Sequence, residues 1–346
     1  MAQILGQWFE QHRRPLPFRQ QYHPYECWIA EVIFQQTRIE QGMPYYHRFL
    51  NQYPTIHALA NASEKEVLKL WQGLGYYRRA QNLLAGARQI VEQHQGIIPS
   101  RREDLLKIRG IGPYIAAALR AIAFNEPDVV VDGNVRRVIS RWFGMTQPVD
   151  TAAGTAAIRS AAHTFLEYLS PRRFNEAIME FGALQCTPTP KCNSCPIQQY
   201  CIAHAEGNPD QYPIRKPRKK PRPQTLHCYH LTDGQRFWVV RRPPEGIWQG
   251  LYLFPHYFTP IPSLSAIAQR IGSLTHVLTH RRLHVILWHA HLSPQQLVQL
   301  DISDGLLITY SQIVTYPMPR LMEKLLEHLP TSFSIPHRSG KFPIGK

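Results

Sequence analysis

The stretch Ser100-Arg-Arg-Glu-Asp-Leu-Leu-Lys-Ile-Arg-Gly-Ile-Gly-Pro-Tyr114 decides the fold of the chain. Ser100 and Glu103 have the spacing of a capping box, and the apolar residues that follow predict a short amphipathic helix. Gly110 and Gly112 allow a tight turn in which the backbone can approach another molecule closely. The proline that follows suits the first turn of a second, alanine-rich helix. The pattern predicts a helix, a Gly-x-Gly turn and a helix, whose exposed backbone amides suit a phosphate.

A second turn follows at Asp132-Gly-Asn134, after three valines and before another helix that ends at Gly144. Asp132 stands where the N-cap of that helix is expected. An aspartate at such a position more often only caps its helix. The alternative is a carboxylate that the helix start holds in place for catalysis.

The two turns together resemble the helix-hairpin-helix DNA glycosylases. The runs Leu106-Lys-Ile-Arg-Gly-Ile-Gly-Pro-Tyr114 and Asp132-Gly-Asn-Val-Arg-Arg-Val138 look most like the adenine DNA glycosylase (MutY) branch. The resemblance implies a mostly helical DNA repair enzyme. Such an enzyme removes adenine mispaired with 8-oxoguanine or guanine by hydrolysing the N-glycosidic bond after base flipping. It also implies DNA contacts by Gly110, Gly112 and Asn134.

The resemblance assigns catalytic roles to two residues of these turns. Asp132 would stabilise, or briefly bond to, the sugar cation that forms when the base leaves. Tyr114 would lie beside Asp132. Bifunctional relatives carry a lysine at the position of Tyr114 and form a Schiff base there. The tyrosine therefore implies a monofunctional, water-using glycosylase that does not cleave the strand.

A third catalytic candidate is the single acid in an apolar helix expected over Trp28–Gln36. Glu31 has aromatic residues one turn away on either side, and a carboxyl group in apolar surroundings has a raised pKa. Such a group can act as a general acid near neutral pH. A lone glutamate more often pairs with an arginine or faces solvent. The runs Leu16-Pro-Phe-Arg19 and Glu31-Val-Ile-Phe-Gln-Gln-Thr37 resemble the family's N-terminal signature, in which this glutamate is catalytic.

The run Gly73-Leu-Gly-Tyr-Tyr-Arg-Arg-Ala80 interrupts a helical region. It suits DNA through close backbone approach, stacking and phosphate pairing. A tight helix-helix turn with packed tyrosines is the alternative, and both can hold. The resemblance implies that Tyr76 and Tyr77 lie against DNA beside the lesion, with Gln36 wedged into the base stack. By position, Glu180 resembles a family residue that contacts the adenine, and a solvent-facing acid is nearly as good an interpretation.

Four cysteines lie close together, which is a strong metal signal: Cys186, Cys192, Cys195 and Cys201. Their spacing leaves zinc and an iron–sulfur cluster as choices, while two disulfides are disfavoured in a reducing compartment. The pattern resembles the family's iron–sulfur loop and implies a 4Fe-4S cluster. The first gap holds five residues where the family usually has six.

Composition favours an anionic partner. The chain of 346 residues has 39 Lys and Arg against 24 Asp and Glu, a net charge of +15, which favours nucleic acid, here mispaired double-stranded DNA. No apolar run reaches membrane-spanning length, and the first residues lack the apolar core of a signal peptide. A cytoplasmic monomer is expected, nucleoid-associated if the source is bacterial.

The sequence predicts a helical glycosylase body over 1–205 and a basic, proline-rich linker over 206–224. An α+β domain is expected over 225–330 and a tail over 331–346. Arg241-Arg-Pro243 and Gly246-Ile-Trp-Gln-Gly-Leu251 resemble the Nudix-like C-terminal domain of adenine glycosylases. The glutamate-rich Mg²⁺ helix of a Nudix hydrolase is missing, so recognition without hydrolysis is expected. Leu278-Thr279-His280 aligns with the family's Phe-Ser-His loop, which touches 8-oxoguanine.

Two other functions compete with this interpretation. An endonuclease III-like or thymine-mismatch glycosylase would share the helical body, but the second domain argues against it. A catalytically silent DNA-binding protein would share the charge, but the presence of both Glu31 and Asp132 argues against it.

Overall fold

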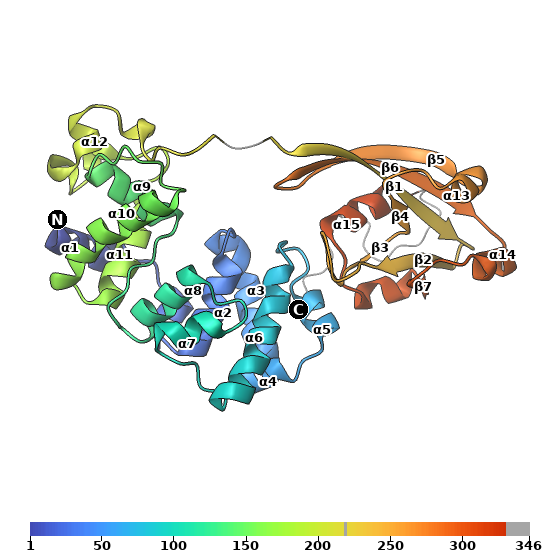
Figure 1. The fold of residues 1–346 in the computed structure, drawn as a ribbon, viewed down its shortest axis with the longest axis horizontal. Coiled ribbons are helices and arrows are strands. Elements are labelled where there is room, and N and C mark those ends of the chain that lie inside the picture. Colours follow the sequence, from blue (N-terminus) through green and yellow to red (C-terminus); the bar gives the residue numbers. More distant parts are fainter. Residues whose placement is uncertain (218–219, 330–346) are drawn as a thin grey trace. The chain divides into compact units, whose positions relative to one another are not determined.

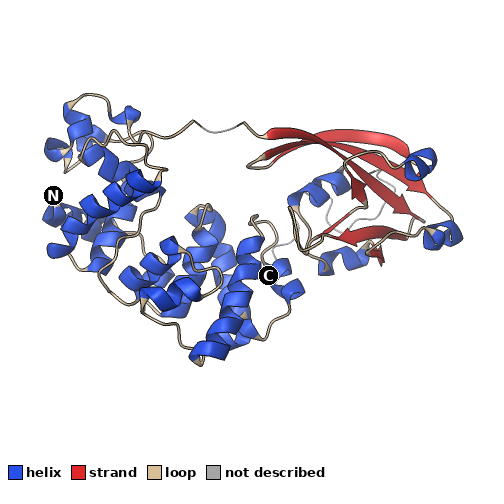
Figure 2. Cartoon of the chain, viewed as in Figure 1, coloured by secondary structure: helices blue, strands red, loops and turns tan. Residues whose placement is uncertain are grey.

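The computed structural model describes residues 1–217 and 220–329, so the predicted tail over 331–346 lies outside the described residues. The chain forms two compact units (Figure 1). The first joins Met1–Asn61 to Ala85–Pro217, and the second joins Ala62–Leu84 to the described residues after Pro217. The first is helical and the second carries the β-sheet (Figure 2). The predicted helical body and α+β domain are therefore confirmed.

Long helices and short connections build the first unit. Its helices are α1 (Ala2–His12), α2 (Pro24–Phe34), α3 (Ile39–Gln52), α4 (Ile56–Ala60), α7 (Arg102–Lys107), α8 (Pro113–Ala118), α9 (Gly133–Trp142), α10 (Ala152–His163), α11 (Pro171–Leu184) and α12 (Ile202–Ala205). Helix α6 (Arg78–His94) begins in the second unit and ends in the first.

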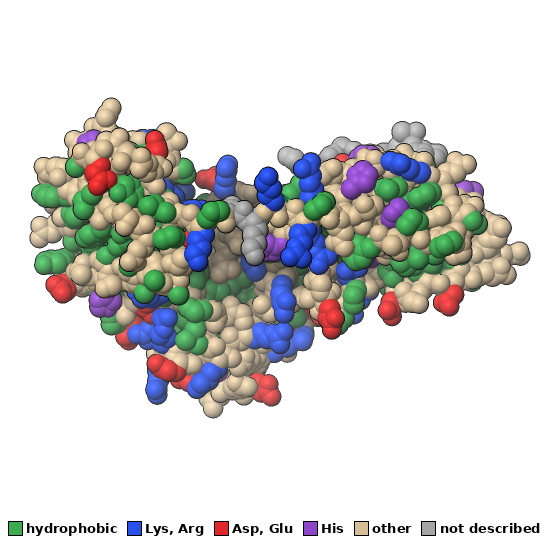
Figure 3. Space-filling view, turned by 45° about the horizontal axis from the view of Figure 1, so that its top comes forward, with side chains coloured by type: hydrophobic (Ala, Val, Ile, Leu, Met, Phe, Trp, Pro, Cys, Tyr) green, Lys and Arg blue, Asp and Glu red, His purple; other side chains and the backbone are tan. Residues whose placement is uncertain are grey.

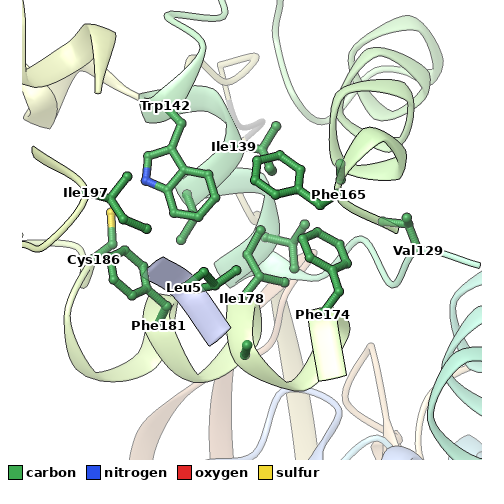
Figure 4. Packing of buried hydrophobic residues seen from close by; sticks show 14 of the residues in the cluster. Leu5, Val129, Ile139, Trp142, Phe165, Phe174, Ile178, Phe181, Cys186 and Ile197 are labelled. Carbon is green, nitrogen blue, oxygen red and sulfur yellow. The ribbon is translucent and has the colours of Figure 1, made fainter. Parts of the chain in front are cut away.

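Helices α1, α9 and α11 share a core with the cysteine loop (Figure 4). Trp142 of α9 and Phe181 of α11 pack at 5.6 Å between ring centroids, and Ile197 of the loop is fully buried beside them. Burial of such side chains contributes roughly 1.5–3 kcal/mol each. Val135, in the first turn of α9, is fully buried in the same core, which holds the start of the helix and with it Asp132.

The helix-hairpin-helix element forms as predicted, with one correction. Helix α7 begins at Arg102 with Arg101 as its N-cap, and no side chain caps it. Ser100 therefore lies outside the helix, and the predicted capping box with Glu103 does not form. The side chain of Glu103 is exposed instead, and its Oε2 lies 3.8 Å from Arg101 Nε. Helix α8 continues as one π-helical segment, Leu119–Ala123.

The second unit is built on a sheet with the strand order β3-β2-β1-β6-β5, to which β4 and β7 add. The strands are β1 (Arg222–Thr232), β2 (Arg236–Arg241), β3 (Tyr252–Leu253), β4 (His256–Tyr257), β5 (Gln269–Val277), β6 (Arg281–His291) and β7 (Gly305–Thr309). The central pair, β1 and β6, is parallel, and the other pairs are antiparallel. Helices α5 (Glu64–Leu70), α13 (Pro262–Ile267), α14 (Pro294–Gln299) and α15 (Arg320–Glu327) complete the unit.

Two boundaries differ from the predictions. Strand β1 starts at Arg222, inside the predicted linker, because its first residues pair with the start of β6. The sequence of Leu264–Ile271 predicts a helix, but helix α13 ends at Ile267 and the chain turns into edge strand β5. Along most of β5, exposed and partly buried residues alternate, which is the pattern of a strand. A prediction made from composition alone misses this alternation.

The segment Ala62–Leu84 packs with the sheet-bearing part through hydrogen bonds. Tyr77 donates its hydroxyl hydrogen to the carbonyl of Met318 at 3.0 Å, and Lys69 Nζ donates to the carbonyl of Tyr316 at 3.1 Å. Gln72 Nε2 donates to Glu323 Oε1 at 3.0 Å. A stretch that the sequence assigned to the helical body therefore belongs structurally to the second unit.

Candidate active site

Three predicted catalytic residues meet in the first unit. Glu31 comes from α2, Tyr114 from the first turn of α8, and Asp132 from the N-cap of α9. Tyr114 donates a hydrogen bond to the Glu31 carboxyl group, and Asp132 lies close enough to act on it electrostatically. All three side chains are partly buried, so each keeps some access to a molecule outside.

Burial raises the pKa of Glu31 to about 7. The hydrogen bond from Tyr114 favours the charged form and limits this rise, whereas the negative charge of Asp132 adds to it. A carboxyl group with a pKa near 7 is largely protonated below neutral pH. Glu31 can therefore hold a proton and donate it, which an exposed glutamate cannot do at the same pH.

Asp132 caps its helix and still faces Glu31. Its Oδ1 accepts a hydrogen bond from the backbone N–H of Val135 at 2.7 Å, and its Oδ2 accepts one from Asn134 Nδ2 at 2.8 Å. Burial raises the pKa of Asp132, and these hydrogen bonds oppose that rise. The N-cap role and the catalytic role are compatible, because the cap fixes the direction of the carboxylate.

The side chain of Asn134 is engaged within the protein. Its Oδ1 accepts a hydrogen bond from Arg137 Nη2 at 2.8 Å, while its amide holds Asp132. This arrangement makes Asn134 a positioning residue for the carboxylate. The predicted DNA contact of Asn134 is not tested by these bonds and stays a prediction.

The carboxylate of Glu180 is buried and hydrogen-bonded within the protein. It is 1% exposed, and Arg14 donates to it from the backbone N–H at 3.0 Å, from Nε at 2.8 Å and from Nη2 at 3.0 Å. Arg19 Nη2 donates to its Oε2 at 3.0 Å. Four hydrogen bonds to one carboxylate make Glu180 an anchor for two arginines. The solvent-facing alternative is wrong, and the contact with adenine stays a prediction.

The sequence interpretation missed Glu176, one turn before Glu180 on α11, and Arg19, its partner. Tyr22 donates its hydroxyl hydrogen to Glu176 Oε2 at 3.0 Å, and Arg19 Nε lies 3.5 Å from Glu176 Oε1. Within the part of the chain that the structure describes, Glu176 Oε1 and Arg19 Nη1 are buried without a hydrogen-bond partner. Arg19 also acts on Glu31. The i,i+4 spacing of the two glutamates was the only sequence signal.

Two predicted DNA-contacting residues have unusual backbones. Gln36 follows α2 with φ 60°, and Tyr76 precedes α6 with φ 46°. Non-glycine residues rarely adopt positive φ, and such positions cluster at functional sites. Both side chains are exposed, Tyr76 to 54%. Tyr77, by contrast, is 7% exposed, so its ring is packed within the protein, and its predicted DNA contact stays a prediction.

The glycine turn between α7 and α8 has two different glycines. Gly110 has φ 87°, a conformation that favours glycine. Gly112 has φ −87°, which any residue can adopt, and an added Cβ there would meet no atom of the protein within 4 Å. Neither backbone strain nor packing explains the glycine at 112. The close approach of DNA that the sequence predicts at this glycine stays a prediction.

The predicted recognition turn lies in the second unit and joins β5 to β6. Leu278 is partly buried, whereas Thr279 and His280 are exposed. The hydroxyl groups of Thr279 and Tyr76 are 2.8 Å apart and share a hydrogen bond. Both line a cavity of about 900 Å³, together with Trp248, His276 and Arg281 among others. Tertiary structure therefore brings together two predicted contact loops that are far apart in the chain.

Basic side chains adjoin this cavity. The parallel register of β1 and β6 places Arg222 beside Arg281, and Lys220 and His280 line the same neighbouring hollow. Like charges directly opposite one another in a sheet are destabilising unless an anion compensates them. Lys and Arg side chains are also numerous on the face shown in Figure 3.

The four cysteines are free thiols on one loop after α11. Cys186 belongs to the buried core, and Cys195 and Cys201 pack against it. Arg141 Nη1 donates to Cys186 Sγ at 3.4 Å, and each of the other three thiols acts electrostatically on Cys195. Within residues 1–217 and 220–329, no group of three or more His, Cys, Asp or Glu side chains is already arranged to hold a metal ion.

Comparisons with known proteins agree with this architecture. Residues 29–159 match the HhH-GPD superfamily of base excision DNA repair proteins, and residues 227–328 match the NUDIX domain. The adenine DNA glycosylase of Buchnera aphidicola subsp. Schizaphis graminum is 30% identical over 94% of this chain and 97% of its own length. That of Arabidopsis thaliana is 35% identical over 72% of this chain and 46% of its own length.

A solved structure is similar to the helical part. A thermostable thymine-DNA glycosylase is 27% identical and has a TM-score of 0.55, covering 59% of this chain and 95% of its own. None of the described helices is long and apolar enough to cross a membrane.

Proposed function

The chain belongs to the adenine DNA glycosylase family, and we propose that it removes adenine mispaired with 8-oxoguanine. It would act as a monomer on double-stranded DNA, in the cytoplasm and, in a bacterium, at the nucleoid. The arrangement of Glu31, Tyr114 and Asp132 carries this proposal, because it combines a protonated acid with a second carboxylate. A glycosidic bond needs both.

The chemistry follows from the protonation of the two carboxyl groups. Glu31 gives its proton to a ring nitrogen of the flipped adenine, the C1′–N bond breaks, and the base leaves with the bonding electrons. Asp132 stabilises, or briefly bonds to, the sugar cation. A water oxygen then bonds to C1′ and loses a proton. The Tyr114 hydroxyl orients Glu31, and no lysine at that position supplies a Schiff base.

The adenine is held by Arg19 and Glu176 in this proposal, and Glu180 acts indirectly. Arg19 Nη1, which has no hydrogen-bond partner, can donate to a base nitrogen. Glu176 Oε1 accepts no hydrogen bond, although it lies 3.5 Å from Arg19 Nε, and it can accept one from an amino group. Glu180 holds Arg14 and Arg19 in place. Gln36, at its strained position after α2, would fill the space that the flipped base leaves.

The rest of the DNA contacts divide between the two units. The Gly110–Gly112 turn would bind a phosphate of the DNA backbone through its amides, with Asn134 near the same strand. Leu278, Thr279 and His280, together with Tyr76, would contact 8-oxoguanine. A hydroxyl group can both donate to and accept from the altered purine edge.

The donor set on the cysteine loop fits an iron–sulfur cluster. Cys186, Cys192, Cys195 and Cys201 are the thiols that would ligate a 4Fe-4S cluster, which needs four thiolates. When bound, the cluster would cross-link the loop and could carry an electron. Arg141, which donates to Cys186 and to the carbonyls of Thr187 and Pro188, would orient the loop around it.

A substrate panel with active-site variants tests the proposed function. Purified protein is given duplexes that contain A opposite 8-oxoguanine, A opposite G, and T opposite G, and release of free base is measured. We expect adenine release that is lost in Glu31→Gln and in Asp132→Asn, with binding of the A:8-oxoguanine duplex retained. Full activity in either variant contradicts the assignment of that residue. Release of thymine instead would support the thymine-mismatch alternative that the similarity to the thymine-DNA glycosylase suggests.

A further inference from the structure

The loop from Gly246 to Gly250 holds a tryptophan in a strained conformation. Trp248 has φ 60°, between two glycines that also have positive φ, 81° and 71°. A bulky side chain in this region is a conformational outlier that costs about 1–3 kcal/mol. Glycine would relieve the strain, so the side chain itself must have a use at this position.

Contacts from three directions hold the loop in place. The N–H of Leu251 donates to the carbonyl of Trp248 at 3.0 Å, and Arg242 Nε donates to that of Ile247 at 3.3 Å. Gln81 Nε2 donates to the carbonyl of Gln249 at 3.3 Å. At Gly250, an added Cβ would lie 3.0 Å from Glu64 Oε1, so the loop sits tightly on α5. A loop fixed in this way presents its side chain without further ordering on binding.

Trp248 lines the 900 Å³ cavity that contains the Tyr76–Thr279 pair. Its ring is partly buried against the core of the second unit and lies 5.8 Å from the ring of His276, tilted by 58°. Leu278, at the edge of the same cavity, has no aromatic ring, whereas the family loop that it resembles has phenylalanine there. Trp248 provides an aromatic surface in the same cavity.

We propose that Trp248 is a base-stacking residue for the purine opposite the excised adenine, an inference that rests on the function proposed above. Arginines at the cavity, Arg78, Arg281 and Arg320, would accompany the phosphates of that nucleotide. Every purine has a π-face, so stacking strengthens binding of guanine and of 8-oxoguanine alike. Trp248 thus contributes affinity, while Thr279 contributes preference between the two bases.

The test compares Trp248→Leu with Trp248→Phe in the full-length protein. Dissociation constants are measured on duplexes that carry non-hydrolysable 2′-fluoro-2′-deoxyadenosine opposite 8-oxoguanine or opposite guanine. For Trp248→Leu we expect binding of both duplexes to weaken by roughly five- to hundredfold, with their ratio kept within about twofold. Trp248→Phe should restore most of the loss. Phe258→Leu, an exposed aromatic residue of the same unit outside the cavity, is the matched control and should bind normally.

A spectroscopic measurement separates stacking from a structural role. With 2-aminopurine at the partner position, wild-type protein should quench its fluorescence more than Trp248→Leu does. Unchanged affinity and quenching in Trp248→Leu overturn the proposal. A large fall in melting temperature that Trp248→Phe does not rescue also overturns it, in favour of packing. Wild-type adenine release on A:8-oxoguanine is measured in parallel, and its absence would overturn the proposed function itself.

Discussion

The hydroxyl groups of Tyr76 and Thr279 lie 2.8 Å apart, although 203 residues separate them in the chain. One belongs to the strained turn before α6, and the other to the turn between β5 and β6. The pair joins a predicted lesion-contacting loop to the predicted 8-oxoguanine loop. Two sequence motifs thus line one cavity, which we propose as the recognition surface.

This pairing predicts non-additive substitutions. Tyr76→Phe and Thr279→Ala should each lower the preference for A:8-oxoguanine over A:G by roughly tenfold, since a lost base-edge contact costs about 1–3 kcal/mol. The double variant should lose little more than the larger single loss, because both residues serve one hydrogen-bonded unit. The measurement is a double-mutant cycle on the ratio of single-turnover rates. Thr275→Ala, an exposed threonine on β5, is the control, and strictly additive losses would refute the coupling.

The raised pKa of Glu31 predicts how adenine excision depends on pH. The proton donor is the protonated form, so the single-turnover rate should be high below pH 7 and fall as pH rises through about 7. Well above this pKa the fall should approach tenfold per pH unit. DNA binding is measured at each pH to separate binding from chemistry. A rate that rises through pH 7 would be inconsistent with Glu31 as the acid.

Glu31 should also lower the free energy of unfolding at alkaline pH. Its folded-state pKa lies above the ordinary 4.5, so the native state binds more protons than the unfolded state between about 4.5 and 7. The contribution of Glu31 to the free energy of unfolding therefore falls as the pH rises from about 4.5 to 7. Glu31→Gln should therefore raise the free energy of unfolding by about 1–3 kcal/mol at pH 8 and much less at pH 5. Denaturant unfolding at both pH values checks this, with exposed Glu103→Gln as the control that should change little.

The two glycines of the hairpin turn should respond differently to alanine. At Gly112 an added methyl group has open space and an ordinary φ, so Gly112→Ala should leave the melting temperature unchanged or slightly higher. The affinity of the Gly112→Ala variant for DNA should fall about tenfold, because the methyl group blocks close approach of a phosphate. Gly110→Ala should lower stability by about 1–2 kcal/mol through strain at φ 87°. Normal DNA binding by Gly112→Ala would remove the turn from the interface.

The cysteine loop predicts a brown protein with about four iron atoms per chain. Iron and zinc are measured in anaerobically purified protein, together with the visible absorption spectrum. Cys192→Ser should lower the iron content and bleach the visible absorption, whereas Cys228→Ser, a buried cysteine of the other unit, should keep both. A colourless protein with stoichiometric zinc would contradict the iron–sulfur assignment.

Local sequence signals were enough to predict the hairpin and the helix start at Asp132, whereas the family resemblance was needed to propose catalytic roles for Asp132 and Glu31. Gly110 and the following proline dictate a turn and a helix start through backbone sterics alone. Asp132 was recognisable because an N-cap is a local arrangement. Glu31 stood out as one acid in an apolar helix, and the structure adds the value of its pKa, which depends on Tyr114 and Asp132 as neighbours.

Sequence signals were poorer wherever a residue's partners lie far along the chain. Glu180 and Glu176 are one turn apart on the same helix and look equivalent in sequence. Arg14 and Arg19 distinguish them, because they hydrogen-bond to both oxygens of Glu180, whereas Glu176 Oε1 accepts no hydrogen bond and has only an ion pair with Arg19. Tyr76 and Tyr77 are adjacent, but only Tyr77 is buried, where its hydroxyl group donates a hydrogen bond to the carbonyl of Met318.

The sequence by itself therefore determined that the hairpin and the helix after Asp132 form, because capping, turn geometry and helical periodicity act over a few residues. The family resemblance added the catalytic roles of Glu31, Tyr114 and Asp132, which stay predictions. Tertiary structure alone decided which side chains remain available to DNA. It placed Ala62–Leu84 with the sheet domain, set Tyr76 against Thr279 and gave Trp248 its cavity. Burial, pKa and hydrogen-bond occupancy depend on atoms that only folding brings within a few ångströms of one another.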